Sequence, residues 1–183
     1  MSKESREKSS KISSAGAARQ APSKSRATAE KPVAAPDFTL TRDDGTTVSL
    51  SDFAGQWLVL YFYPRADTPG CTLEAHDFTR LAPSFAKLGA AVLGVSADPP
   101  KKLANFRTKH GLKVQLASDE THAMLDAFGA WGEKSMYGKT FLGVVRSTVL
   151  IDPKGRIRRK WPNVKVTGHA EEVLAALKSA QSE

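Results

Sequence analysis

One stretch near the middle of the chain places a strand directly before a helix. Residues 57–63 form an apolar run rich in aromatic side chains, bounded by Gly55 and Pro64, which predicts a buried β-strand. Thr68 and Pro69 then give a helix-start signal, because a hydroxyl that can accept from free amides precedes a proline suited to the first helical position. The chain must therefore pack a helix back onto the strand it has just left, which favours an α/β fold.

Cys71 is the only cysteine of the 183 residues, and it falls in the first turn of this predicted helix. Unpaired backbone N–H groups and the positive end of the helix dipole stabilise a thiolate there, and the thiolate is the reactive form of cysteine. A lone cysteine is more often a small buried apolar residue, so its position alone does not establish a catalytic role. A single cysteine also excludes an internal disulfide, and nothing indicates an oxidising compartment.

Pro64, Thr68 and Cys71 form the pattern Pro-x-x-x-Thr-x-x-Cys, which resembles the active-site signature of the peroxiredoxins. The wider string over residues 61–72, Tyr-Phe-Tyr-Pro-Arg-Ala-Asp-Thr-Pro-Gly-Cys-Thr, is similar to the bacterioferritin comigratory protein, or peroxiredoxin Q, branch. The resemblance implies a thiol-dependent peroxidase that reduces hydrogen peroxide and small organic hydroperoxides through a sulfenic acid on Cys71. It further implies that Thr68 touches the peroxide and that Pro64 keeps water off the thiolate. The simpler alternatives are a helix cap for Thr68 and a strand terminator for Pro64.

The same chemistry needs a cation to support the charge that leaves with the distal oxygen. Arg146 stands at the start of the apolar stretch 147–151, where a charge is costly unless it has a partner. This stretch resembles the family segment whose arginine contacts the peroxidatic cysteine, so the resemblance implies that role for Arg146; a structural salt bridge is the alternative. Glu74, one turn after Cys71, would either orient an arginine or be a solvated acid. We expect Arg65 to point to solvent.

The chain departs from many proteins of this branch, which carry a second cysteine five residues after the first, where His76 stands here. An external thiol, namely thioredoxin, glutaredoxin or a low-molecular-weight thiol, must then resolve the Cys71 sulfenic acid. We expect no cofactor and no metal site, since the four histidines show no ligand spacing, and we expect a monomer or weak dimer. The competing interpretations are a peroxide-sensing redox switch and a polyanion-tethered thioredoxin-like binding protein without sustained turnover.

Residues 1–35 differ in composition from the rest of the chain. They are rich in Ser, Ala, Lys and Arg with almost no large apolar side chains, which predicts a disordered basic tail. Residues 1–32 carry a net charge of +5 out of the chain's +8. Non-specific nucleic-acid contact, a cleavable organelle-targeting peptide and a plain solubilising tail all stay open as roles. We expect a cytoplasmic protein, with nucleoid or nuclear association or organelle targeting through the tail as alternatives, and no apolar run long enough for a membrane span.

Residues 36–183 alternate strand and helix patterns and form the predicted domain. Leu73 is one of the apolar residues whose spacing predicts a helix after Cys71, and residues 131–134 are assigned a packing role. The expected elements are a hairpin over 38–50, the strand 57–63, a helix ending at Gly89, a strand over 90–95, a helix over 100–110, a short strand over 113–117, a short helix over 122–128, strands over 144–151 and 156–161, and a last helix over 170–180. This order resembles the thioredoxin fold in its peroxiredoxin form, an α/β fold with a mixed central sheet flanked by helices and an N-terminal hairpin.

Overall fold

The computed structural model describes residues 31–183. Its strands are β1 (Val33–Ala34), β2 (Thr39–Arg42), β3 (Thr47–Ser49), β4 (Trp57–Phe62), β5 (Ala90–Ser96), β6 (Gln115–Ser118), β7 (Trp131–Met136), β8 (Lys139–Val144), β9 (Ser147–Ile151) and β10 (Arg156–Trp161). Its helices are the 3₁₀ turn η1 (Leu50–Phe53), α1 (Pro69–Lys87), α2 (Pro100–His110), α3 (Ala123–Ala127) and α4 (His169–Gln181).

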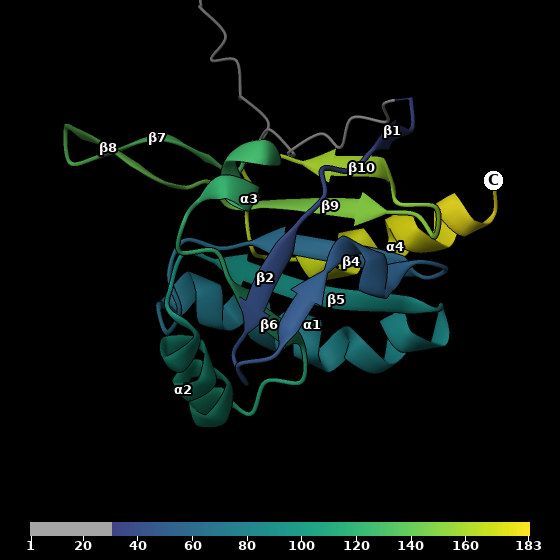
Figure 1. Ribbon diagram of the computed structural model, residues 1–183, viewed down its shortest axis with the longest axis horizontal. Helices are drawn as coiled ribbons and strands as arrows, with labels where there is room; N and C mark the ends of the chain where they lie inside the picture. Colours follow the sequence, from purple (N-terminus) through teal and green to yellow (C-terminus); the bar gives the residue numbers. More distant parts are fainter. Residues whose placement is uncertain (1–30) are drawn as a thin grey trace, which may run out of the picture.

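An eight-stranded sheet in the order β1-β10-β9-β4-β5-β6-β2-β3 runs through the domain (Figure 1). The neighbours β4, β5 and β6 are parallel, whereas β9 runs antiparallel to β4, so the sheet is mixed, as predicted. Side chains of β4 are buried on both faces of the sheet, which explains why its sequence is a continuous apolar run rather than an alternating one.

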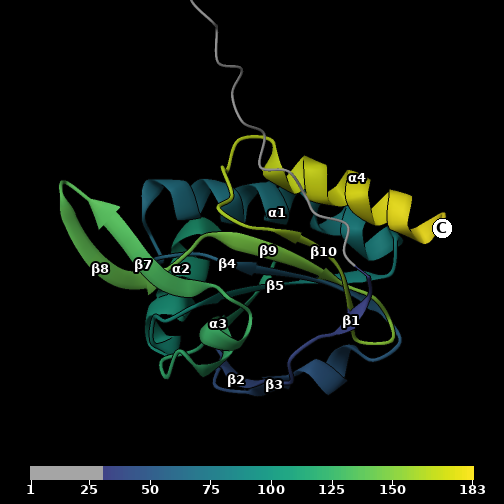
Figure 2. The same cartoon turned by 90° about the horizontal axis from the view of Figure 1, so that it is seen from above.

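Each face of the sheet carries its own hydrophobic core. Helices α1, α2 and α4 contribute to the first core, whereas β2, β3, η1 and α3 contribute to the second, below the sheet in Figure 2. Successive aromatic residues of β4 serve the two cores in turn: Tyr61 stacks on Phe78 of α1, and Phe62 packs against Phe128 on the other side. The strand that leads to Cys71 is therefore fixed from above and below.

The hairpin β7–β8 was not predicted, and it extends away from the rest of the domain (Figure 1). Most of its side chains are exposed or half-buried, so its sequence lacks the apolar alternation that indicates a strand packed on a core. The hairpin closes through a two-residue turn, Tyr137 and Gly138, both with positive φ (51° and 73°), as a tight hairpin requires. The glycine of this turn is the one feature of the sequence that could have indicated a hairpin here.

The predicted strand over 144–151 is interrupted, because β8 ends at Val144 and β9 begins at Ser147. The two residues between them form backbone hydrogen bonds with other segments of the chain. The Val145 N–H donates to the Ala130 carbonyl, and the Arg146 carbonyl accepts from the Val164 N–H, each at 2.8 Å. Arg146 thus lies in a connection just outside the sheet ladder.

Leu73, one of the apolar residues whose spacing predicts this helix, does not join the core, since its side chain is 48% exposed. Cys71, Glu74 and Phe78 occupy the buried face of α1, and Leu73 is turned about 100° from Glu74. At the start of the domain, β1 pairs with β10, so ordered structure already begins before Pro36. The predictions for residues 1–30 lie outside the described residues, and within residues 31–183 no helix is long and apolar enough to cross a membrane.

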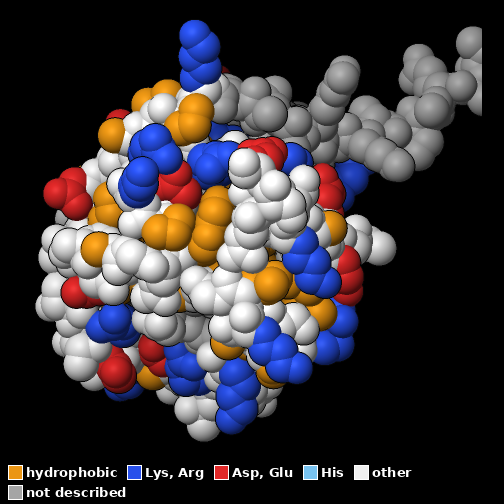
Figure 3. Space-filling view, turned by 90° about the vertical axis from the view of Figure 1, so that its right-hand side faces the viewer, with side chains coloured by type: hydrophobic (Ala, Val, Ile, Leu, Met, Phe, Trp, Pro, Cys, Tyr) orange, Lys and Arg blue, Asp and Glu red, His pale blue; other side chains and the backbone are white. Residues whose placement is uncertain are grey.

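The surface of the domain is only weakly basic overall. Residues 33–183 hold +3 of the chain's +8, which is what remains after the +5 of residues 1–32. On the face seen in Figure 3, Lys and Arg side chains are dispersed among acidic and uncharged ones. Polyanion contact thus stays a prediction that concerns the first residues of the chain rather than this face of the domain.

Candidate active site

Cys71 is the third residue of α1, in the first helical turn, as predicted. The residue is only 1% exposed. Thr68 precedes the helix with extended backbone angles, and its carbonyl accepts the Thr72 N–H at 2.9 Å. At this helix start the backbone N–H groups have no helical partners, and the helix dipole favours negative charge. The backbone at this helix start therefore presents partial positive charge near Cys71 before any charged side chain is counted.

Arg146 brings the nearest charge to the sulfur. Its Nη2 lies 3.3 Å from the Cys71 Sγ, although the two residues are 75 positions apart. Its Nη1 donates to the carboxylate of Glu74, so one guanidinium bridges two groups on the same face of α1. The cysteine contact and the salt bridge, which the sequence left as alternatives, are both present, because they use different nitrogens of one side chain.

The absence of a side chain at Gly70 leaves space for the Arg146 guanidinium. A Cβ placed on Gly70 would lie 3.2 Å from the Arg146 Nη2, which is tighter than an ordinary van der Waals contact. Because the same guanidinium is tied to Glu74, it has little freedom to move aside. Glycine at position 70 thus permits the close passage of the arginine over the helix start.

Glu74 is not a solvated acid, because it is 1% exposed and its Oε1 has no hydrogen-bond partner among the described residues. Burial raises the pKa of Glu74 to about 7, against the opposing effect of the Arg146 charge. Of the two alternatives for Glu74, a solvated acid is therefore wrong, and its ion pair with Arg146 agrees with an acid that orients the arginine.

Thr68 and Pro64 lie in the loop that joins β4 to α1. The Thr68 hydroxyl does not cap the helix; it donates to the Arg65 carbonyl at 2.8 Å, which corrects the capping interpretation. Pro64 is half-buried and stands two residues beyond the end of β4. Arg65 is exposed, as predicted. The structure thus gathers Pro64, Thr68 and Cys71 in one strand–loop–helix unit and brings Arg146 to it from the connection that precedes β9.

Two other basic side chains lie near enough to Arg146 for its charge to lower their pKa values. His169 is buried and pairs with the Thr148 hydroxyl at 2.8 Å; burial lowers the pKa of His169 to about 4, and Arg146 adds to the effect. Lys134 donates to the Val144 carbonyl at 2.9 Å, and burial together with the Arg146 charge lowers the pKa of Lys134. Arg146 is therefore the side chain that places positive charge directly on the sulfur.

Histidines that are far apart in sequence do meet, because the rings of His76 and His110 lie 5.6 Å apart between centroids. His110 also pairs with Asp67 at 2.7 Å. Within residues 31–183, however, no three His, Cys, Asp or Glu side chains are placed to share a metal ion.

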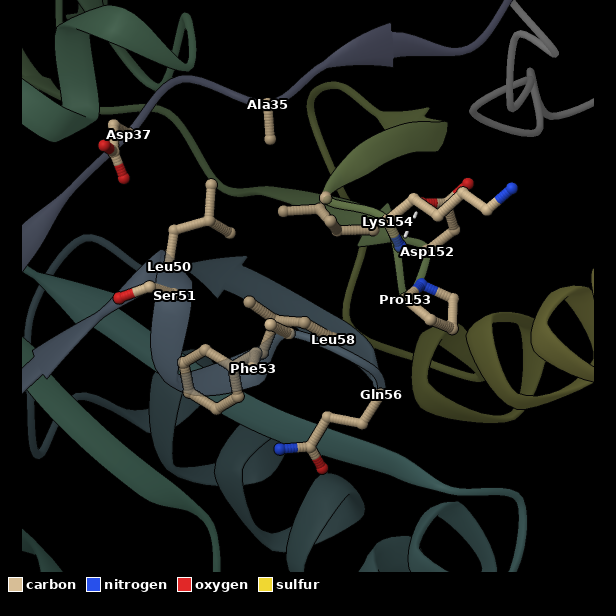
Figure 4. Close-up of a pocket in the computed structure, with 13 residues that line it drawn as sticks. Ala35, Asp37, Leu50, Ser51, Phe53, Gln56, Leu58, Asp152, Pro153 and Lys154 are labelled. Atoms are coloured by element: carbon tan, nitrogen blue, oxygen red, sulfur yellow. Dashed lines mark hydrogen bonds between the residues drawn. The ribbon is translucent and has the colours of Figure 1, made fainter.

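A cavity of about 420 Å³ lies at the opposite end of β4 from Cys71 (Figure 4). Leu58 and Phe53 line it on one side and the turn around Pro153 on the other. Asp152 at its rim is satisfied by the backbone N–H groups of Lys154 and Arg156, each at 2.9 Å. The lining contains neither cysteine nor arginine, so this cavity is not part of the thiol site.

Comparison with known proteins agrees with this geometry. Residues 33–160 match the AhpC/TSA family. The chain is 49% identical over 150 residues to a peroxiredoxin Bcp of Xanthomonas campestris, covering 82% of this chain and 94% of that protein, and 47% identical over 144 residues to a peroxiredoxin Bcp of Bacillus subtilis, covering 79% and 92%.

Solved structures give the same result. The bacterioferritin comigratory protein of X. campestris, described with its alkyl peroxide reduction activity, superposes with a TM-score of 0.75 at 48% identity over 78% of this chain and 91% of that one. A cysteine-to-serine mutant of peroxiredoxin Q from Xylella fastidiosa gives a TM-score of 0.76 at 41% identity, over 84% and 99%. With its thioredoxin-like fold and a buried thiol at a helix start, the chain belongs to the AhpC/TSA family and is a peroxiredoxin, a thiol peroxidase related to the Bcp and peroxiredoxin Q proteins.

Proposed function

We propose that the protein reduces hydrogen peroxide and small organic hydroperoxides through a sulfenic acid on Cys71, which an external thiol resolves. The Cys71 thiolate attacks one peroxide oxygen; an S–O bond forms and the O–O bond breaks. The leaving oxygen departs as hydroxide or alkoxide and takes up a proton to give water or an alcohol. Sulfur is thereby oxidised by two electrons and the peroxide is reduced by two.

The observation that carries this proposal is the contact of 3.3 Å between Arg146 Nη2 and the Cys71 Sγ at the start of α1. A fixed cation beside the sulfur stabilises the thiolate, and it also faces the position where negative charge develops on the leaving oxygen. We assign Thr68 the role of a hydroxyl that meets the bound peroxide and Pro64 that of shielding the thiolate from water. The alkyl peroxide reduction described for the X. campestris relative supports organic hydroperoxides as substrates.

The composition supports resolution by an external thiol, because Cys71 is the only cysteine of the chain. A thiol R–SH attacks the sulfenic sulfur, releases water and leaves a mixed disulfide on Cys71. A second equivalent of R–SH then attacks that disulfide, which frees the Cys71 thiol and yields R–S–S–R. No step needs a second cysteine in the protein.

Stopped-flow mixing of the reduced protein with hydrogen peroxide or tert-butyl hydroperoxide tests the first half of the proposal, with Cys71→Ser as the control. Intact mass should show one added oxygen per chain, and one thiol adduct after reductant is supplied. Steady-state turnover should follow with at least one of thioredoxin, glutaredoxin with glutathione, or a small dithiol. Oxidation of Cys71 no faster than that of free cysteine would refute the peroxidase proposal, and a single oxidation that none of these thiols reverses would instead identify a redox switch.

A further inference from the structure

The loop of residues 63–68 carries both Pro64 and Thr68, and its shape decides where those two residues stand. The loop enters through Tyr63, whose N–H donates to the Val95 carbonyl at 3.1 Å. At its centre lies Ala66, which is 2% exposed and whose N–H donates to the Asp98 Oδ2 at 2.8 Å. The middle of the loop is thus fastened to a side chain 32 positions further along the sequence.

Asp98 is itself held through both its carboxylate and its backbone. Its Oδ2 also accepts from the Ser96 hydroxyl at 3.0 Å, and its Oδ1 accepts from the Lys102 ammonium at 2.8 Å. Its N–H donates to the Ser96 Oγ at 3.2 Å, and its carbonyl accepts from the Ser118 hydroxyl at 2.6 Å. A carboxylate held in this way has little freedom to move, so the loop must conform to it.

The other tie between this loop and α2 is of a different kind. Asp67 receives Lys109 at 2.8 Å and His110 at 2.7 Å, but its side chain is 41% exposed and the bonds reach its carboxylate rather than the loop backbone. Water can replace those partners, whereas the buried Ala66 N–H has the Asp98 oxygen as its partner.

We propose that Asp98 is a positioning residue for the peroxide reaction, holding the loop so that Thr68 and Pro64 face the Cys71 sulfur. This inference rests on the proposed function. Without the carboxylate, the Ala66 N–H would be buried without an acceptor, and the loop would have to move toward water to satisfy it. Such a movement shifts the peroxide pocket and leaves the helix start and Arg146 in place, so the thiolate persists while its peroxide chemistry declines.

Three variants separate this role from general stability. Asp98→Ala removes the acceptor. Asp98→Asn keeps an oxygen for the Ala66 N–H and loses the ion pair with Lys102, and Lys102→Met loses the same ion pair while leaving Asp98 intact. Each is compared with the wild type in two reactions at Cys71: oxidation by hydrogen peroxide, which uses the loop, and alkylation by iodoacetamide, which reports only an accessible thiolate.

We expect Asp98→Ala to slow peroxide oxidation by about tenfold or more while alkylation changes by less than about threefold, because small misplacements of reacting groups are costly in rate. Asp98→Asn and Lys102→Met should stay within about threefold of the wild type in both reactions, since the Lys102 end of the ion pair is exposed to water and the Ser96 hydroxyl still holds the side chain at position 98. An unchanged peroxide rate in Asp98→Ala, an equal change in both reactions, or an equal loss in Lys102→Met would overturn the inference.

Hydrogen exchange of the Ala66 amide in the wild-type protein keeps the inference falsifiable if Asp98→Ala does not fold. We expect this amide to exchange about a hundredfold or more slowly than an unprotected one, and exchange at the unprotected rate would overturn the inference. The wild type also separates the two proposals. A wild type that is slow with peroxide refutes the proposed function, whereas a fast wild type with an equally fast Asp98→Ala refutes only the role of Asp98.

Discussion

Glu74→Gln tests the electrostatics of the site directly, because it removes a buried negative charge and changes the side chain's shape very little. The carboxylate is 1% exposed, and one of its oxygens has no partner among the described residues. Burial raises the pKa of Glu74 from 4.5 to about 7 in the folded protein. In the unfolded chain the same group titrates near its ordinary value of about 4.3.

The sign and size of the effect follow from this difference. Between these two pKa values the unfolded chain releases the Glu74 proton and the folded chain retains it, so the free energy of unfolding falls as pH rises from about 4.5 to about 7. At 1.36 kcal/mol per pKa unit the loss amounts to about 3 kcal/mol. Glutamine does not ionise, so the variant avoids this loss. Relative to the wild type, the variant should therefore gain about 3 kcal/mol of stability between pH 4.5 and pH 7.5.

Urea denaturation followed by tryptophan fluorescence, at half-unit steps from pH 4.5 to 8, measures the difference between the two proteins. Other titrating groups cancel in that difference, and Glu120→Gln, on an exposed residue, serves as the matched control. A stability difference that stays constant with pH would refute the reasoning, and so would a variant that loses stability relative to the wild type as pH rises.

Arg146→Ala should slow oxidation of Cys71 by hydrogen peroxide about a hundredfold, because it removes the cation beside the developing charge. Stopped-flow kinetics measures the rate, and a thermal melt checks that the domain stays folded. A loss of rate under threefold would contradict the proposed role of Arg146. Gly70→Ala should slow the same step about tenfold by pushing the guanidinium off the sulfur, since its Cβ would meet Arg146 at 3.2 Å, and an unchanged rate would show that the arginine can yield. Burial lowers the pKa of His169 from 6.5 to about 4, so this residue contributes stability above pH 6.5 that is lost as pH falls toward 4, about 3 kcal/mol in all. In urea denaturation, His169→Gln should lose less stability than the wild type as pH falls over this range. An equal loss in both proteins would contradict the prediction.

The parts of the fold that could be predicted from the sequence are those with local causes. Residues 57–63 are apolar throughout because β4 is buried on both faces, and α1 begins at Pro69, whose fixed backbone angle suits the first helical position. The hairpin β7–β8 could not be predicted for the converse reason: its strands are mostly exposed, so apolar and polar residues do not alternate along them.

The residues of the candidate site likewise include some with local causes and some that depend on the tertiary fold. The position of Cys71 at a helix start is a property of four consecutive residues, so it is visible in the sequence. Its cation is a property of the tertiary fold: Arg146 lies 75 positions from Cys71 and 72 from Glu74, and the strand order β9-β4 brings them together. Resemblance to a family supplied the role of Arg146, but it did not supply the buried acid that aims it.

Glu74 shows why such a residue escapes inference from sequence. An acid one turn along a helix is usually solvated, and only the burial of that face by the sheet turns it into an unsolvated charge. The burial that costs stability also strengthens its hold on the guanidinium, because an ion pair away from water is screened little. In the proposed role of Arg146, the guanidinium already lies at the sulfur before peroxide arrives, so it need not reorganise when charge moves onto the leaving oxygen. On this reasoning Glu74→Gln exchanges reactivity for stability. The variant that gains stability relative to the wild type as pH rises should also oxidise more slowly near pH 7.5. A variant that showed this gain with no loss of peroxide rate would separate the orientation of Arg146 from its charge.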